Sequence, residues 1–232
     1  YDMPLLGYGN RTVNTLRLWS AEPVADSFDY HGFNRGDYSK SIEYKYSVES
    51  ITEILYPDDS NYHGRVLRLK QQYFFVSAGV QSIVRYVKRK CGSIHYLDDL
   101  AAIHINDTHP ALVIPELMRI LMDEEGMGWQ EAWQLVSGTV SYTNHTVLPE
   151  AMEKWPEEII QQLLPRIHMI IQEINTRFCR ELAARYGEDS ERIREMAIIK
   201  DGYVHMANMA VVACYSVNGV AKIHTEILKK DV

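Results

Sequence analysis

Hydrophobic residues in the first half of the chain recur at steps of three and four, a spacing that predicts a long helix buried along one stripe. They are Tyr73, Val76, Val80, Ile83, Val84 and Val87. The basic residues 88–90 suit the last turn of this helix, where the backbone dipole favours positive charge. Upstream, TVNTLRLWS predicts a strand within residues 11–20, and YPDDSNYHG predicts a polar, turn-rich loop over residues 56–64.

Two short apolar runs lead into polar loops, and each loop precedes a helix pattern. Residues 101–105 predict a buried strand that ends in NDTHP, where Thr108 can cap a helix that begins at Pro110. That helix should stop at Gly126, and residues 129–136 predict another. The string GTVSY then predicts a second strand, which runs directly into TNHTVLPE.

The rest of the chain is predicted to be mainly helical. Helices are expected to begin near Pro156 and Pro165 and after Ser190, and residues 206–217 and 220–230 predict two more. Strands that alternate with long helices favour an α/β fold, in which a Rossmann-like sheet is covered by helices. Because no linker or repeat interrupts the pattern, we expect residues 1–232 to form a single unit.

Composition narrows the class of protein. The formal net charge is −7 and no basic stripe is present, so nucleic acid is not an expected partner. No apolar run approaches the ~18 residues of a membrane span, so no membrane interaction is expected. The three cysteines, Cys91, Cys179 and Cys214, are far apart in the sequence, which indicates buried free thiols in a reducing, cytoplasmic compartment. Neither end resembles a natural terminus, and we therefore expect an internal piece of a longer protein.

The candidate chemistry lies in two loops, because ligands of open α/β sheets bind beyond the carboxyl ends of the strands. One loop covers residues 106–110 and includes Asp107, Thr108 and His109; the other covers residues 143–150 and includes Asn144 and His145. Carboxylates, amides and imidazoles can bind the hydroxyls of a sugar. The alternative is that Thr108 and Asn144 only cap helices. For the two histidines, their position favours function.

Other kinds of site have less support. His104, Asp107 and His109 cluster within six residues, but no HExxH or CxxC spacing supports a metal site, and none is expected. The sequence also lacks the GxSxG of a serine hydrolase and the GxGxxG and GxxxxGK[ST] phosphate loops.

Five strings spread over nearly the whole chain resemble the α-glucan phosphorylase family. They are NTLRLWSAE, ILYPDDSNYHGRVLRLKQQYFFVSA, INDTHPALVIPELMRIL, YTNHTVLPEAMEKWP and VNGVAKIHTEILKK. The resemblance implies the later part of the N-terminal domain of a two-domain (GT-B type) glycosyltransferase. It also implies pyridoxal phosphate as cofactor, α-1,4-glucan and phosphate as substrates, α-glucose 1-phosphate as product, and a homodimer.

The resemblance also suggests roles for individual residues. His145 is similar to the catalytic-site residue that holds the 6-hydroxyl of the transferred glucosyl unit. Asp107 and His109 resemble residues that line the subsite of the acceptor sugar, and Asn144 adjoins His145 as a further candidate for substrate binding. Four more residues resemble a gate loop and its charged neighbour: Tyr56, Asp59, Ser60 and Arg68. The family pattern has asparagine where this chain has Ser60.

The cofactor half of the family's active site has no counterpart among the five strings. The C-terminal domain with its cofactor lysine is absent, so no pyridoxal phosphate is expected on this chain and the isolated chain is expected to be inactive. The alternative is a stand-alone glucan-binding or assembly module derived from the family, for which the missing half would not matter.

Overall fold

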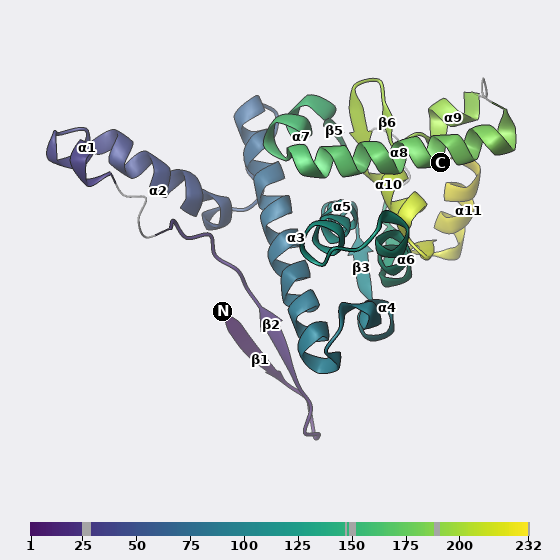
Figure 1. The fold of residues 1–232 in the computed structure, drawn as a ribbon, viewed down its shortest axis with the longest axis horizontal. Helices are drawn as coiled ribbons and strands as arrows, with labels where there is room; N and C mark the ends of the chain where they lie inside the picture. Colours follow the sequence, from purple (N-terminus) through teal and green to yellow (C-terminus); the bar gives the residue numbers. More distant parts are fainter. Residues whose placement is uncertain (25–28, 147, 149–151, 188–190, 232) are drawn as a thin grey trace. The chain divides into compact units, whose positions relative to one another are not determined.

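The computed structural model describes residues 1–24, 29–146, 148, 152–187 and 191–231 (Figure 1). The chain divides into two compact units, residues 1–78 and residues 79–232, each of which is described by itself. The sequence predicts one unit over the whole chain; that both units belong to one domain of a longer protein stays a prediction.

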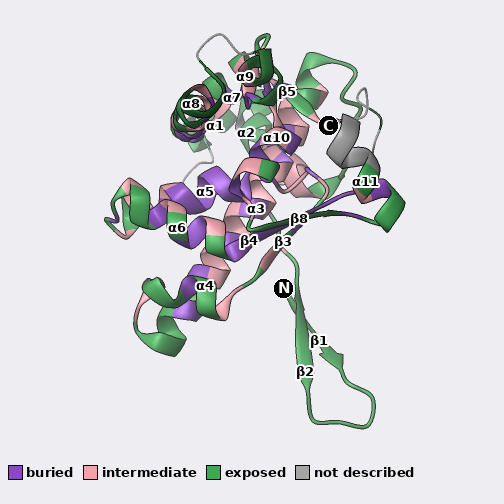
Figure 2. Ribbon diagram, turned by 90° about the vertical axis from the view of Figure 1, so that its right-hand side faces the viewer, coloured by how far each residue is buried: buried purple, intermediate pink, exposed green. Residues whose placement is uncertain are grey.

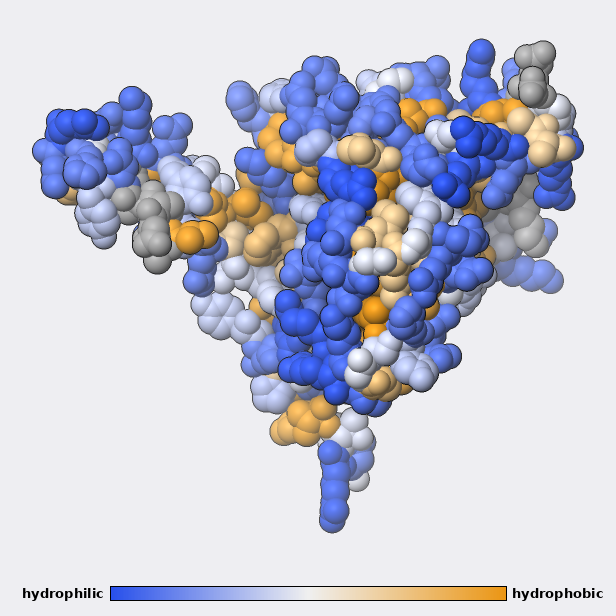
Figure 3. All heavy atoms as spheres, in the orientation of Figure 1, coloured by the Kyte–Doolittle hydropathy of each residue, from blue (hydrophilic) through white to orange (hydrophobic). Residues whose placement is uncertain are grey.

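Unit 1 begins with an antiparallel hairpin of two exposed strands, and the other regular elements described in it are helices. Its elements are β1 (Asp2–Leu6), β2 (Val13–Arg17), α1 (Tyr30–Asn34), α2 (Tyr38–Glu53) and the start of α3 (Tyr62–Cys91). The strand predicted within residues 11–20 is confirmed as β2, whereas β1 was not predicted. Hydrophobic side chains are visible at the surface over this hairpin in Figure 3, and Leu6 is 81% exposed.

The predicted polar loop of residues 56–64 is shorter than expected, because α3 already begins at Tyr62. The side chain of Asn61 explains the early start. Its Oδ1 accepts a hydrogen bond from the backbone N–H of Gly64 at 2.9 Å, which satisfies one of the free donors of the first helical turn.

Unit 2 contains a three-stranded parallel sheet, an antiparallel sheet and most of the helices. Its strands are β3 (Ile103–Asn106), β4 (Val140–Asn144), β5 (Lys154–Pro156), β6 (Ile199–Lys200), β7 (Tyr203–His205) and β8 (Ser216–Gly219). Its α-helices after α3 are α4 (Leu97–Leu100), α5 (Val113–Arg119), α6 (Trp129–Thr139), α7 (Glu157–Leu163), α8 (Pro165–Tyr186), α9 (Glu191–Met196), α10 (Met206–Ala213) and α11 (Lys222–Asp231). A 3-10 turn, η2 (Ile94–Tyr96), and a π-helical turn, η3 (Ile120–Glu124), complete the unit.

The parallel sheet has the strand order β3-β4-β8. Asn106 lies opposite Thr143, and Thr143 lies opposite Asn218. Because the three strands run in the same direction, the segments that follow β3 and β4 leave the sheet at the same edge. Buried residues gather on α5, α6, α10 and β4 in Figure 2, and β4 is buried along its whole length. The predicted α/β fold class is confirmed.

Two features of the sequence-based assignment are wrong. Thr108 does not cap a helix, because α5 begins only at Val113 and the Thr108 hydroxyl donates to Glu153 instead. The helix predicted over residues 206–217 ends at Ala213. Beyond it, the N–H of Tyr215 donates to the carbonyl of Val140 at 3.1 Å, and the chain continues as β8 beside β4. The antiparallel sheet β5-β7-β6 was not predicted. The prediction of buried thiols is wrong for Cys91, which is exposed near the end of α3.

Candidate functional site

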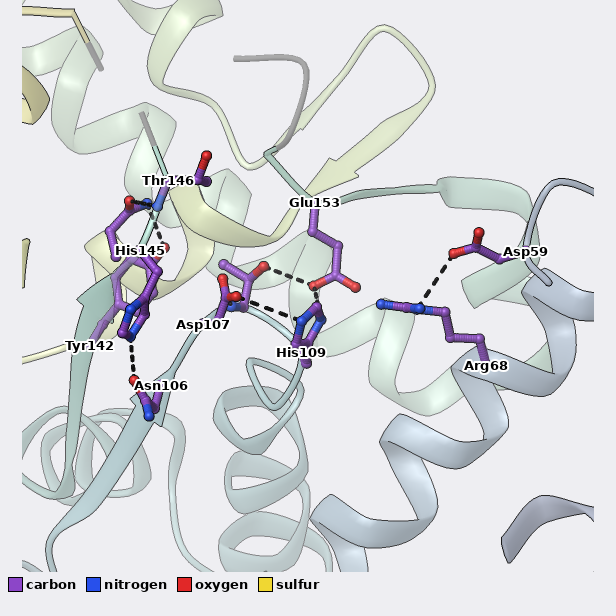
Figure 4. A network of polar contacts seen from close by, with 11 residues as sticks. Asp59, Arg68, Asn106, Asp107, His109, Tyr142, His145, Thr146 and Glu153 are labelled. Atoms are coloured by element: carbon purple, nitrogen blue, oxygen red, sulfur yellow. Dashed lines mark hydrogen bonds and ion pairs between the residues drawn. The ribbon is translucent and has the colours of Figure 1, made fainter. Parts of the chain in front are cut away.

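The loops after β3 and β4 do leave neighbouring parallel strands, as the sequence predicts. His145, just after β4, is exposed, and its Nε2 contacts the Oδ1 of Asn106 at the end of β3 (Figure 4). The two strand ends are therefore joined by a pair of polar side chains. Val147, Pro149 and Glu150 of the second predicted loop lie outside the described residues.

The loop after β3 begins with an unusual backbone conformation. Asp107 has a φ of +106°, a region that side-chain-bearing residues rarely occupy and that stores strain. Its Oδ1 accepts a hydrogen bond from the N–H of Thr108 at 3.0 Å, so the carboxylate supports the turn that it opens. The side chain remains 40% exposed, which leaves carboxylate surface available to a ligand.

His109 lies between two carboxylates (Figure 4). Its Nε2 is 3.6 Å from the Oδ2 of Asp107, and its Nδ1 is 3.6 Å from the Oε2 of Glu153. Both distances exceed that of a hydrogen bond and correspond to ion pairs only when the ring is protonated. The Nδ1 atom is itself buried and has no hydrogen-bond partner, whereas 42% of the side-chain surface is exposed.

Glu153 is a member of this cluster that the sequence reasoning missed. It directly precedes β5, and its carboxylate accepts a hydrogen bond from the hydroxyl of buried Thr108 at 2.8 Å. Only 14% of its side chain is exposed. The one available signal was its place in the string EAMEKWP, which gives no indication of a contact with a residue 45 positions upstream.

Asn144, in contrast to His145, is fully engaged within the protein. Its amide nitrogen donates to the hydroxyl of Tyr142 at 2.9 Å, its oxygen accepts the N–H of Thr146 at 2.8 Å, and it is 3% exposed. Burial, the largest cause, raises the pKa of Tyr142 to about 12; the hydrogen bond from Asn144 acts in the opposite direction. Asn144 does not cap a helix, because the hydrogen bond that its side chain accepts from the N–H of Thr146 closes a local turn.

Tyr142 and Asn144 line a cavity of about 310 Å³ beside β4 and β8, whose other lining residues are mostly apolar and come from α8, α9, α10, β8 and α11. Neither His109 nor His145 belongs to its lining. The side chain of Asn144 therefore points into the interior of unit 2, away from the exposed loop surface on which His145 lies.

His104 has a structural role. Within the sheet, its Nδ1 lies 2.8 Å from the hydroxyl of Ser141 and its Nε2 lies 2.7 Å from that of Thr143. Both ring nitrogens are thus occupied by neighbours on β4. Over the part of the chain that the structure describes, no three His, Cys, Asp or Glu side chains are grouped so that they could hold a metal ion.

The predicted gate residues belong to unit 1 and form a small cluster there. The Nε of Arg68 lies 3.6 Å from the Oδ2 of Asp59, and its guanidinium lies over the ring of Tyr56, 5.5 Å from the centroid. The N–H of Ser60 donates to the Oδ1 of Asp58 at 3.0 Å. Tyr56 has a φ of +56° and is 74% exposed. The structure thus brings Tyr56, Asp59 and Arg68 together, with Ser60 next to Asp59 in the chain.

Comparison with known proteins identifies the family. The family model described as carbohydrate phosphorylase matches residues 1–232. The chain belongs to the carbohydrate phosphorylase family. It is 54% identical to a glycogen phosphorylase of Bacillus subtilis (strain 168) over 99% of this chain, and 46% identical to the muscle form of glycogen phosphorylase of Homo sapiens over 100% of it. It spans only 28% and 29% of the length of these two relatives. Among the described helices, none is both long and apolar enough to cross a membrane.

Proposed function

We propose that this chain is part of an α-1,4-glucan phosphorylase, which cleaves terminal α-1,4-glucosidic bonds with phosphate and releases α-glucose 1-phosphate. The observation that carries the proposal is the polar edge of the parallel sheet in a chain that matches the phosphorylase family throughout. There, exposed His145 contacts Asn106, and Asp107 and His109 of the adjoining loop cluster with Glu153. In the same proposal the whole protein is a cytoplasmic homodimer.

These side chains suit the recognition of sugar hydroxyls. An imidazole can donate to or accept from the 6-hydroxyl of the transferred glucosyl unit, which is the role we propose for His145. Asp107 and His109 offer acceptors and donors for the hydroxyls of the acceptor sugar. Hydrogen bonds that strengthen as the transferred ring flattens would favour the oxocarbenium-like transition state over the bound substrate. Tyr56, Asp59, Ser60 and Arg68 are proposed to form the gate in the whole protein.

Pyridoxal phosphate, the cofactor proposed for the whole protein, does not fit the residues present. A site for it requires a lysine for the Schiff base and cations for the phosphate. The cluster after β3 instead contains the carboxylates of Asp107 and Glu153. Lys154 is next to Glu153 in the chain, but its Nζ lies over the ring of Tyr203, 4.9 Å from the centroid. The proposed active site therefore needs a cofactor-binding part from elsewhere in the whole protein.

The test compares the full-length protein with the isolated 232-residue chain, each incubated with pyridoxal phosphate, maltoheptaose and phosphate. We expect the full-length protein to release α-glucose 1-phosphate and to retain pyridoxal absorbance after gel filtration. The isolated chain is expected to do neither. A full-length protein without phosphorolysis would refute the proposed activity, and stoichiometric cofactor on the isolated chain would refute the assignment of its residues to the sugar side.

A further inference from the structure

We infer that Glu153 is a positioning residue, which holds the loop after β3 in the conformation that presents Asp107 and His109 to the acceptor sugar. The inference rests on the proposed function for the identity of the ligand. The structural part of the inference does not depend on the ligand. It is that the hydrogen bond between Thr108 and Glu153, here called the clamp, holds the loop in place.

The loop needs such a clamp because its backbone is strained. Asp107 has a φ of +106°, and conformations of this kind persist only when the surrounding structure imposes them. The hydrogen bond from the N–H of Thr108 to the Oδ1 of Asp107 is local and can form in other conformations of the loop. The hydroxyl bond of Thr108 to Glu153 is different, since it joins residues 45 positions apart and fixes the turn to another part of unit 2.

Glu153 is well anchored for this task. Its carbonyl accepts the N–H of Met206 at 3.2 Å, and the next residue, Lys154, pairs with His205 in the antiparallel sheet β5-β7-β6. The side chain is 14% exposed, so its rotamer is constrained by packing. The carboxylate reaches Thr108 and His109 together, because Oε2 lies 2.8 Å from the Thr108 hydroxyl and 3.6 Å from the Nδ1 of His109.

This arrangement assigns different tasks to neighbouring groups. Asp107 and His109 remain 40% and 42% exposed and can meet a ligand, whereas Thr108 is only 4% exposed and serves the clamp. The buried Nδ1 of His109, which has no hydrogen-bond partner, faces the carboxylate of Glu153. Loss of Glu153 should therefore displace the turn at Asp107 and the imidazole of His109 together, while the other side chains of the site, Asn106 and His145, stay in place.

The test uses the full-length protein with substitutions at both ends of the clamp. Glu153→Ala and Thr108→Val should each raise the KM for maltoheptaose roughly tenfold, equivalent to about 1.4 kcal/mol, and should leave the KM for phosphate unchanged. The conservative variants Glu153→Gln and Thr108→Ser keep an acceptor and a hydroxyl, so each should stay within about threefold of the unmodified protein. The double variant Thr108→Val/Glu153→Ala should be no worse than Glu153→Ala alone, because both changes remove the same bond.

Two matched controls separate positioning from a general loss of structure. Thr139→Val removes the buried hydroxyl that donates to Leu135 within α6, and Glu157→Gln alters the carboxylate that contacts buried His168 at 2.7 Å. Both should lower the Tm while leaving the KM for maltoheptaose unchanged. Hydrogen exchange of the peptide covering residues 102–112 gives a readout besides activity, and it should accelerate in Thr108→Val and Glu153→Ala but not in the controls.

The results that would overturn the inference are distinct from those that bear on the proposed function. Unchanged exchange in both clamp variants, or KM defects that multiply in the double variant, would show that Glu153 does not position this loop. If Glu153→Ala does not fold, Thr108→Val removes the same bond from its other end, and Thr108→Ser, which keeps the hydroxyl, is its control. Accelerated exchange in a full-length protein that performs no phosphorolysis would refute the proposed function and leave the clamp itself supported.

Discussion

The loops after β3 and β4 occupy equivalent places at the edge of the same sheet, yet they are held in different ways. The loop after β3 is fixed by a long-range bond, from Thr108 to Glu153, and contains the strained Asp107. The turn after β4 is fixed locally, by the bond between the N–H of Thr146 and the oxygen of Asn144. Position at a strand end therefore does not reveal which side chain binds a ligand and which supports the backbone.

Within each loop, the supporting and the ligand-accessible side chains are neighbours in the sequence. Asn144 is buried with both ends of its amide occupied, and His145, the next residue, is exposed. Thr108 is buried in the clamp, and His109 is partly exposed. We therefore expect substitution of His145 to reduce mainly activity and substitution of Asn144 to reduce mainly stability. The predictions below test how the two loops differ, from the largest expected effect to the smallest.

The largest effect is expected for His145→Ala in the full-length protein. Loss of a hydrogen bond that strengthens in the transition state costs on the order of 2 to 4 kcal/mol, or roughly thirty- to a thousand-fold in kcat/KM. The change in Tm should be small, because the side chain is exposed and its described partner is the exposed Asn106. Steady-state kinetics and thermal denaturation measure the two effects.

A substrate analogue controls for the identity of the contact. In the direction of glucan synthesis, a glucose 1-phosphate donor without its 6-hydroxyl should react slowly with the unmodified protein and almost equally slowly with His145→Ala. Defects that multiply would mean that His145 does not bind this hydroxyl. A large fall in Tm with little loss of turnover would reverse the assignment and make His145 the structural member of the pair.

The second prediction concerns Asn144→Ala, which should mainly reduce stability. The substitution leaves the Tyr142 hydroxyl and the Thr146 N–H without their partner, and an unsatisfied buried polar group costs about 1 to 3 kcal/mol. Asn144→Asp retains an oxygen for the Thr146 N–H and should lose less. Denaturant unfolding measures the change. If Asn144→Ala leaves stability intact but abolishes turnover, the side chain binds substrate in spite of its burial.

The parts of this structure that were predictable from sequence are those that local patterns determine. Alternation of apolar runs and helical stripes predicted the α/β class, and the strand patterns before NDTHP and TNHT predicted that two polar loops follow sheet strands. The stop at Gly126 was also correct, since its φ of +72° suits glycine and the helical turns end just before it. Each of these signals is carried by residues close together in the chain.

The parts that could not be predicted depend on contacts between distant residues. Nothing near Thr108 indicated that its hydroxyl would bind Glu153 in place of a helix N-terminus, because both are ordinary uses of a buried threonine. Likewise, the pattern of residues 206–217 suits a single helix, but the helix ends at Ala213 and residues 216–219 form β8, which pairs with β4 and extends the sheet. The sequence pattern identified exposed candidates such as His145 and His109. It did not identify Glu153, whose carboxylate contacts the loop that contains His109.

The smallest effect expected is a difference between two substitutions of Asp107. The variants Asp107→Ala and Asp107→Gly both lack the carboxylate that accepts the Thr108 N–H, so their affinities for glucan should fall by the same amount. They differ in the backbone, since a φ of +106° strains alanine but not glycine. Glycine relieves roughly 1 to 3 kcal/mol of strain, but its greater freedom in the unfolded chain costs about 0.5 to 1 kcal/mol. Asp107→Gly should therefore be more stable than Asp107→Ala by about 1 kcal/mol.

Asp201 is the control, because its φ of +52° lies in the left-handed helical region, which alanine tolerates better. The difference in stability between Asp201→Gly and Asp201→Ala should therefore be smaller than the difference at Asp107. Denaturant unfolding of all four variants gives the comparison. An Asp107→Ala variant as stable as Asp107→Gly would mean that the loop after β3 is not strained, and the contrast with the turn after β4 would then rest on the Glu153 clamp alone.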